Sequence, residues 1–216
     1  RQLTADMLTA LAVSPRDRVV EFAPGLGATA RELLGRHPAS YTAVDKDADA
    51  VARTRAVVEP EGGTVIMSPA QHVPLPDAEA TVVVGEAMLT MQSDANKAAV
   101  VAEAARLLGK GGRYAIHELC LVPDDISDEL AQEIWDDLSR TIHVGARPIT
   151  AAAWRELLES HGFTVTTELR APMALLSPRR LIADEGFVAT VRFAGRLVTD
   201  RAARARVRGM RRARTL

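Results

Sequence analysis

Short apolar runs alternate with longer amphipathic stretches along most of the chain. The runs are rich in β-branched residues and bounded by glycine, proline or polar turns, which is typical of strands buried on both faces. They predict strands over residues 19–22, 41–45, 63–67, 81–85 and 114–119. The stretches between and around them predict helices over residues 4–12, 28–35, 46–58, 93–108, 128–140 and 151–161. Because strands and helices alternate through short connections, we expect parallel strands with right-handed crossovers.

The pattern changes after Gly162. Residues 163–169 alternate apolar and polar positions, and a second run over 171–176 follows after a turn at Arg170. Two adjacent strands joined so briefly must be antiparallel. Residues 181–197 and 202–214 predict two further helices, so we expect one domain over 1–216, with a core over about 14–177 and a helical extension over about 178–216.

Composition places the chain among soluble globular proteins. At 216 residues it can form one large α/β domain, and 47% hydrophobic with 25% charged residues excludes a disordered or collagen-like class. No apolar run is long enough to span a membrane, and no basic segment leads into an apolar one at the amino end. Cys120 alone cannot form an internal disulfide or a multi-thiolate metal site, so we expect a cytoplasmic protein without a metal.

Positive charge is concentrated at the carboxyl end. Residues 192–216 hold nine arginines and one acidic residue, Asp200, although the whole chain carries a net charge of −1. This asymmetry can serve an anionic partner, or it can be a solvated helix beside an acidic body. With only 4% aromatic residues to stack on bases, nucleic acid is not the expected partner. We expect a small-molecule substrate, and a homodimer is an assembly that the sequence permits.

The first predicted strand leads directly into a glycine turn. Gly25 and Gly27 permit positive φ and let the main chain approach a ligand without a Cβ in the way. A carboxylate precedes them in the spacing Glu21-x-Ala23-Pro24-Gly25-x-Gly27. This segment resembles the first motif of class I S-adenosylmethionine (SAM) dependent methyltransferases, in which the turn and the following helix hold the methionine part of the cofactor.

Asp45 ends the second predicted strand, 18 residues beyond Gly27. In doubly wound folds an acidic side chain at this place accepts hydrogen bonds from ribose hydroxyls. By the same resemblance, the adjacent Lys46 is expected to lie along the adenine.

The loop 68–76 resembles the methyltransferase segment that borders adenine. That segment commonly carries an acidic or amide side chain, and here Pro69 replaces it. We therefore expect the main-chain N–H of Ala70 and the side chain of Gln71 to border the adenine edge instead.

Two later segments complete the resemblance. The fourth predicted strand opens into Glu86, Ala87, Met88 and Met91, a loop too apolar to be only surface, and both methionines are candidates for pocket walls or for the core. The leucine pair and glycine turn over 107–113, followed by a strand, is similar to the family pattern at the fifth strand.

The resemblance covers about 19–177 and implies an α/β, Rossmann-like, doubly wound fold. The implied sheet is mostly parallel, with seven strands, one antiparallel strand near the carboxyl end, and helices on both faces. It also implies methyl transfer from SAM to a small organic acceptor. The implied cofactor residues are Glu21, Ala23, Pro24, Gly25, Gly27, Asp45, Lys46, Pro69, Ala70, Gln71, Glu86, Ala87 and Met91.

A neutral acceptor would need a base. His117, near the end of the fifth predicted strand, is the first candidate, with Glu118 beside it to orient the ring or face the pocket, and His143 is the alternative base. Because neighbouring strand residues point to opposite faces, only one of His117 and Glu118 can look into the site.

Two other functions stay open at this point. Gly25-x-Gly27-x-x-Ala30 with Asp45 also fits an NAD(P)-binding oxidoreductase. A SAM-binding scaffold protein that has lost catalysis would carry the same cofactor motifs.

Overall fold

The computed structural model describes residues 2–172. These residues fall into two compact units, one formed by 2–120 with 148–170 and the other including 121–147. The expected extension over 178–216, with its two helices, lies outside the described residues. The prediction of a single domain over the whole chain therefore stays a prediction.

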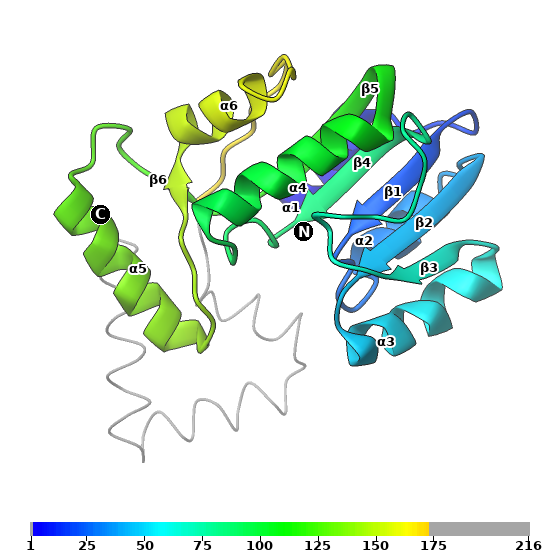
Figure 1. Cartoon of the computed structure of the whole chain (residues 1–216), viewed down its shortest axis with the longest axis horizontal. Coiled ribbons are helices and arrows are strands. Elements are labelled where there is room, and N and C mark those ends of the chain that lie inside the picture. The colour runs from blue at the N-terminus through cyan, green and yellow to red at the C-terminus, as the bar shows by residue number, and fades with distance from the viewer. Residues whose placement is uncertain (1, 173–216) are drawn as a thin grey trace. The chain divides into compact units, whose positions relative to one another are not determined.

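The main sheet has five strands, all parallel, in the order β3-β2-β1-β4-β5 (Figure 1). They are β1 (Arg18–Phe22), β2 (Ser40–Asp45), β3 (Thr64–Met67), β4 (Ala80–Glu86) and β5 (Leu108–His117). Each overlaps a segment that the apolar pattern predicts as a strand, so the parallel α/β architecture is confirmed, although β5 begins earlier than the predicted 114–119 and ends at His117.

The prediction of seven strands with one reversed strand is not matched by this sheet. Residues 163–169, predicted as a strand, carry no strand in the structure, although Phe163 and Val165 are half-buried and their polar neighbours are exposed. A strand needs a hydrogen-bonded neighbour. The segment predicted to supply one, 171–176, falls almost entirely outside the described residues.

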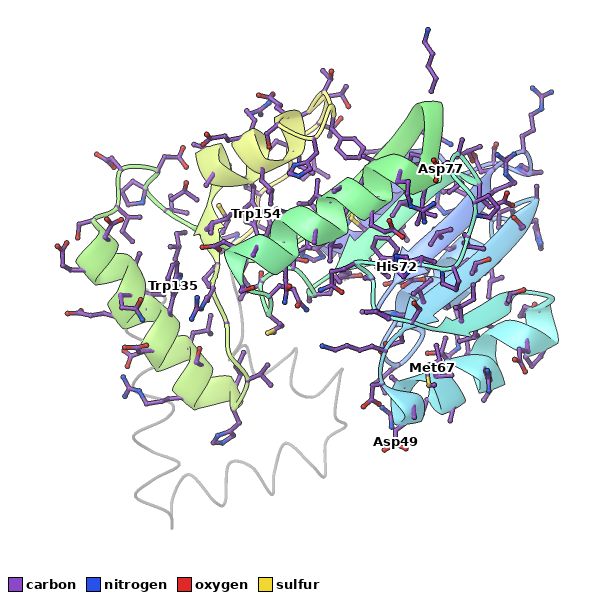
Figure 2. All side chains as sticks on the ribbon, in the orientation of Figure 1. Asp49, Met67, His72, Asp77, Trp135 and Trp154 are labelled. Atoms are coloured by element: carbon purple, nitrogen blue, oxygen red, sulfur yellow. The ribbon has the colours of Figure 1, made fainter. Side chains whose placement is uncertain are left out.

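Helices cover both faces of the sheet. On one face, apolar side chains of α1 (Gln2–Leu11), α2 (Ala28–Leu34) and α3 (Ala48–Val58) form a core with the strands. On the other, α4 (Asp94–Leu107) and α6 (Ala151–Glu159) form a second core, to which Trp154 contributes (Figure 2). A 3-10 turn (Glu59–Glu61) follows α3. The prediction of helices on both faces is confirmed.

The strands feed both cores by alternation. Val19 of β1 packs into the first core, whereas Val20 and Phe22 pack into the second. Since every one of these side chains is at most 3% exposed, the strand is buried on both sides, as its unbroken apolar run predicts.

Strand β5 is irregular at its start. Ala80 of β4 pairs with Leu108, but Val82, two residues further, pairs with Arg113, so residues 109–112 form an excursion between the two pairings. Gly111 in this excursion has φ of 80°, which a glycine adopts without strain. The expected turn over 107–113 is thus part of the strand's own path.

The second unit contains α5 (Asp128–Ile142), capped by the Ser127 hydroxyl, which accepts a hydrogen bond from Leu130 N. Ser139 on this helix accepts a hydrogen bond from Ala146 N at 2.9 Å, and Arg147 lies over the ring of Trp135 at 5.9 Å. Two short strands lie outside the main sheet, β6 (Cys120–Leu121) and, in the first unit, β7 (Ile149–Thr150).

Candidate functional site

The strand order reverses between β1 and β4. From β1 the chain proceeds outward through β2 and β3, and it then returns to place β4 and β5 on the other side. In open parallel sheets, ligands bind at the carboxyl ends of the strands at such a reversal. Most of the residues predicted for the site lie at or just beyond this edge.

The glycine turn after β1 is held against β2. Ala23 has φ of 51° and donates a hydrogen bond to Val44 O at 2.8 Å, and Gly27 N donates to Pro24 O at 2.9 Å. Val44 immediately precedes Asp45, so these bonds place the turn beside the end of the second strand.

Glycine is favoured at positions 25 and 27 for different structural reasons. Both have positive φ, 58° at Gly25 and 72° at Gly27. A Cβ at Gly27 would lie 3.3 Å from Val57, so Gly27 is needed for close packing onto α3, whereas nothing lies within 4 Å of a Cβ at Gly25. Gly25 therefore exposes bare main chain toward open space. Gly27, the N-cap of α2, makes no side-chain capping bond.

Glu21 lies below this surface. Its side chain is 2% exposed and accepts a hydrogen bond from the Tyr41 hydroxyl. Burial and the nearby charge of Glu86 together raise its pKa to about 7, although the hydrogen bond from Tyr41 acts in the opposite direction. Tyr41 was not predicted as a partner, because it lies in the next strand.

Asp45 is half-buried at the end of β2, and its Oδ1 accepts a hydrogen bond from Asp47 N at 3.0 Å. Asp47 in turn caps α3 by accepting from Ala50 N at 2.8 Å. Lys46 is exposed beside it, and Met67, which pairs with Asp45 at the end of β3, is 61% exposed (Figure 2). The structure thus leaves one Asp45 oxygen and a rim of exposed side chains at this edge.

The loop after β3 is held from below by Arg106 of α4. Its guanidinium donates to Val73 O at 3.0 Å and Leu75 O at 2.9 Å, and it forms ion pairs with Glu103 and Asp77, each at 2.7 Å. This clamp fixes the loop that contains Pro69, Ala70 and Gln71. Pro69 is exposed, and Ala70 and Gln71 are half-buried.

Four side chains from four elements meet beside the reversal. Glu86 Oε1 accepts a hydrogen bond from the Thr4 hydroxyl of α1 at 2.6 Å and lies 2.8 Å from His117 Nδ1 of β5. Its Oε2 accepts from the Thr29 hydroxyl of α2 at 2.7 Å. Burial opposes ionisation of Glu86, but the hydrogen bonds from His117, Thr4 and Thr29 outweigh it and lower the pKa of Glu86 to about 2.

Glu118 does not orient His117. Its carboxylate accepts hydrogen bonds from Met88 N at 3.0 Å, Leu89 N at 2.8 Å, and both Thr90 N and the Thr90 hydroxyl, at 2.9 and 2.6 Å. Burial raises the pKa of Glu118, although these four bonds act in the opposite direction. Glu118 therefore braces the loop that follows β4, and the expectation that it orients the histidine ring is replaced by the contact with Glu86.

Met88 and Met91, the two methionine candidates in the loop after β4, differ in their exposure to solvent. Met88 is 8% exposed and belongs to the second core, whereas Met91 is 36% exposed. Ala87 is exposed with φ of 52°, and its N–H donates to His117 O at 2.8 Å. Of the two, Met91 alone keeps the surface that a pocket wall needs.

His143, the alternative base, lies in the second unit. It is exposed at the carboxyl end of α5 with φ of 58°. Sequence analysis did not predict four residues that contact the site: Thr4, Thr29, Tyr41 and Arg106. Each contact joins residues far apart in the chain, so no local pattern reports it.

Two kinds of feature are absent from residues 2–172. No group of three potential metal ligands is present there. The helices of this part of the chain are too short or too polar to cross a membrane.

Comparison with known proteins agrees with this architecture. A family model described as a methyltransferase domain matches residues 1–168. An uncharacterized protein of Haemophilus influenzae is 31% identical over 179 residues, covering 81% of this chain and 69% of the relative.

Solved structures share the fold. A Galdieria sulphuraria protein assigned as a sarcosine dimethylglycine methyltransferase has a TM-score of 0.71 at 18% identity, covering 97% of this chain and 77% of its own. Geranyl diphosphate methyltransferase in complex with SAM has a TM-score of 0.66 at 16% identity, covering 77% and 66%. The family match extends over most of the chain, and the strand order and glycine turn agree with it. The chain belongs to the class I SAM-dependent methyltransferase family.

Proposed function

We propose that this protein transfers a methyl group from SAM to a small organic acceptor. The observation that carries the proposal is the junction of the glycine turn with the second strand. The bond from Ala23 N to Val44 O holds the turn that contains Gly25 beside the end of β2, where Asp45 follows Val44. One anion-compatible turn and one ribose-compatible acid thus lie at neighbouring strand ends.

The residues present fit the cofactor. The open space over Gly25 and the uncapped turn at Gly27 suit a carboxylate held by main-chain N–H groups. The free lone pairs of Asp45 suit ribose hydroxyls. We assign Lys46, Ala70 and Gln71 to the border of the adenine and Pro69, Ala87 and Met91 to the rim, and none of these six residues is fully buried.

Glu21 contributes from beneath the turn. Because its carboxyl group is buried and bonded to Tyr41, it supports the turn from within and does not contact a bound ammonium group directly. Pro24, which is buried, helps to fix the turn by accepting the hydrogen bond from Gly27 N.

A sulfonium methyl group is already activated toward substitution, so the reaction needs neither a metal nor a covalent enzyme intermediate. The protein's task is to hold the acceptor in line with the reacting bond and to exclude water. Such positioning can contribute about 7–11 kcal/mol to the lowering of a barrier.

Isothermal titration with SAM, its demethylated product and NAD tests the proposal. We expect the first two to bind and NAD not to bind. NAD binding without SAM binding would reassign the chain as an oxidoreductase. Binding of SAM with no methyl transfer to any member of a broad acceptor panel would instead identify a silent SAM-binding protein.

Asp45→Ala locates the cofactor. Loss of hydrogen bonds from the ribose to a charged acceptor costs about 1.5–3 kcal/mol, which corresponds to about a tenfold to hundredfold weaker SAM affinity. Asp49→Ala is the matched control, since Asp49 is exposed on the first turn of α3 (Figure 2). Equal affinities of the two variants would mean that the ribose does not lie at Asp45.

A further inference from the structure

We propose that Glu86 and His117 form a proton-accepting pair, and that the methyl acceptor is therefore a molecule whose nucleophilic atom carries a proton, such as a hydroxyl, thiol or ammonium group. This inference rests on the proposed methyl transfer and names its substrate class. It also assigns Glu86 to the histidine and not to direct contact with the cofactor.

The pairing follows from the register of the sheet. Glu86 and His117 are directly opposite each other at the last position of the β4–β5 ladder. Their side chains point to the same face, and Glu86 Oε1 lies 2.8 Å from Nδ1 of the histidine. Both side chains are 25% exposed, so the pair reaches the surface of the carboxyl edge.

The hydrogen bond decides the tautomer of the histidine. With its low pKa, Glu86 is ionised at neutral pH and can only accept hydrogen bonds. His117 must then donate from Nδ1, which leaves the lone pair of a neutral ring on Nε2. Within the described residues this Nε2 makes no hydrogen bond, so it is available to accept a proton from a ligand.

The other partners of Glu86 hold it in place for this task. The hydroxyls of Thr4 and Thr29 come from two different helices, α1 and α2, and each donates to one of the two carboxylate oxygens. Glu21 is the other acidic group whose charge interacts with Glu86, and its raised pKa reduces the negative charge beside the pair. A carboxylate fixed by three neighbours is a poor candidate for a cofactor ligand and a good one for a positioning residue.

The proposed reaction transfers one methyl group to the acceptor and removes one proton from it. The acceptor atom uses a lone pair to bond the methyl carbon, while the carbon–sulfur bond breaks and leaves its electron pair on sulfur. A hydroxyl or thiol has this lone pair from the start, whereas an ammonium group must lose its proton before it can attack. The proton of the acceptor passes to Nε2 of His117, and the resulting imidazolium is stabilised by Glu86. That proton later leaves to solvent. An acceptor that is already anionic, such as a carboxylate, gains nothing from the pair.

The tautomer can be measured directly. In protein labelled with ¹⁵N-histidine, long-range ¹H–¹⁵N spectra at a pH of about 8, where an ordinary imidazole is neutral, distinguish a protonated from a bare ring nitrogen. We expect His117 to show a protonated Nδ1 and a bare Nε2. A protonated Nε2 in the wild-type protein, with or without a protonated Nδ1, would overturn the proposal without the need for any variant.

Two substitutions of Glu86 separate position from charge. Glu86→Ala removes the acceptor, and we expect the tautomer preference of His117 to be lost. Glu86→Gln keeps an oxygen for Nδ1–H but not the charge, so the tautomer should persist while kcat falls at least about tenfold. Glu118→Gln is the control, because the hydrogen bonds of Glu118 go to the loop over 88–90 and not to the ring of His117, so the spectrum of His117 should stay unchanged. An unchanged tautomer in a folded Glu86→Ala protein, or an unchanged kcat in Glu86→Gln, contradicts the pairing.

Kinetics and binding together separate this inference from the proposed function. His117→Ala should lower methyl transfer to hydroxyl and thiol members of an acceptor panel by about 10²–10⁴-fold, with SAM affinity within about threefold of wild type. A loss of SAM affinity of about tenfold or more in Glu86→Ala would return Glu86 to the cofactor site and overturn the inference. Methylation of carboxylates alone would do the same. Failure of the wild-type protein to bind SAM would refute the proposed function, whereas the tautomer measurement would still stand.

Discussion

Glu118 offers the sharpest test of how the loop after β4 is held. Its carboxylate is the shared acceptor for three main-chain N–H groups and one hydroxyl over residues 88–90. In Glu118→Ala, all four donors lose their partner in a largely buried place. Since each unsatisfied buried donor costs about 1–3 kcal/mol, and the burial of the charge itself is relieved, we expect a net loss of about 3–5 kcal/mol in the free energy of unfolding.

Glu118→Gln should cost much less. The remaining amide oxygen can keep two of the four donors, and the Thr90 hydroxyl can rotate to accept from the new NH₂ group. Thr90 N then stays unsatisfied and the Thr90 hydroxyl proton must find another acceptor, which corresponds to a loss of about 1–3 kcal/mol.

Urea denaturation followed by circular dichroism measures both values. Glu156→Ala is the control, because Glu156 is exposed on α6 and a surface change of this kind stays within about 0.5 kcal/mol. If Glu118→Ala unfolded within about 0.5 kcal/mol of the wild-type protein, the loop would not depend on this carboxylate, and the assignment of Glu118 as a brace would be wrong.

Three further changes test other contacts. Arg113 and Ser14 outweigh burial to lower the pKa of Asp17 from 3.8 to about 2, so its stabilising effect is present above pH 3.8 and is lost as the pH falls toward 2. Asp17→Asn should therefore be less stable than wild type by about 2 kcal/mol at neutral pH, and this difference should shrink as the pH falls through about 2 and vanish below it; a constant difference across the range would contradict the linkage. Gly27→Ala, strained by its positive φ and crowded by Val57, should unfold more easily by about 1–2 kcal/mol or more in the same urea assay. Arg106→Lys should weaken SAM binding several-fold by loosening the loop after β3, and it should speed amide hydrogen exchange at Val73 and Leu75; unchanged exchange would show that the clamp is dispensable.

The architecture was predictable because its signals are local. The run over 81–85 and the glycine turn after β1 each report their own structure, whatever the rest of the chain does. The strand predicted over 163–169 rested on a pairing with another segment, which alternation alone cannot supply. Patterns inside one element therefore predicted more than patterns that needed a partner.

The partner of His117 shows the same limit at the site. Glu118 is its neighbour in sequence, but adjacent strand residues diverge, and the residue that meets the ring comes from β4. To find Glu86, one must know the register between the two strands. That register includes the excursion over 109–112, which shifts the pairing by several residues and leaves no trace in the apolar pattern.

Arg106 fixes the position of the loop after β3 through contacts with the main chain of that loop. Its guanidinium reaches carbonyl oxygens at Val73 and Leu75, which every amino acid supplies equally. Substitutions at the neighbouring positions Gln71, His72 and Pro74 can therefore accumulate without releasing the anchor. During divergence, the side chains at these three positions can change the chemistry that the loop offers to a ligand, while the contacts of Arg106 keep its main chain in place.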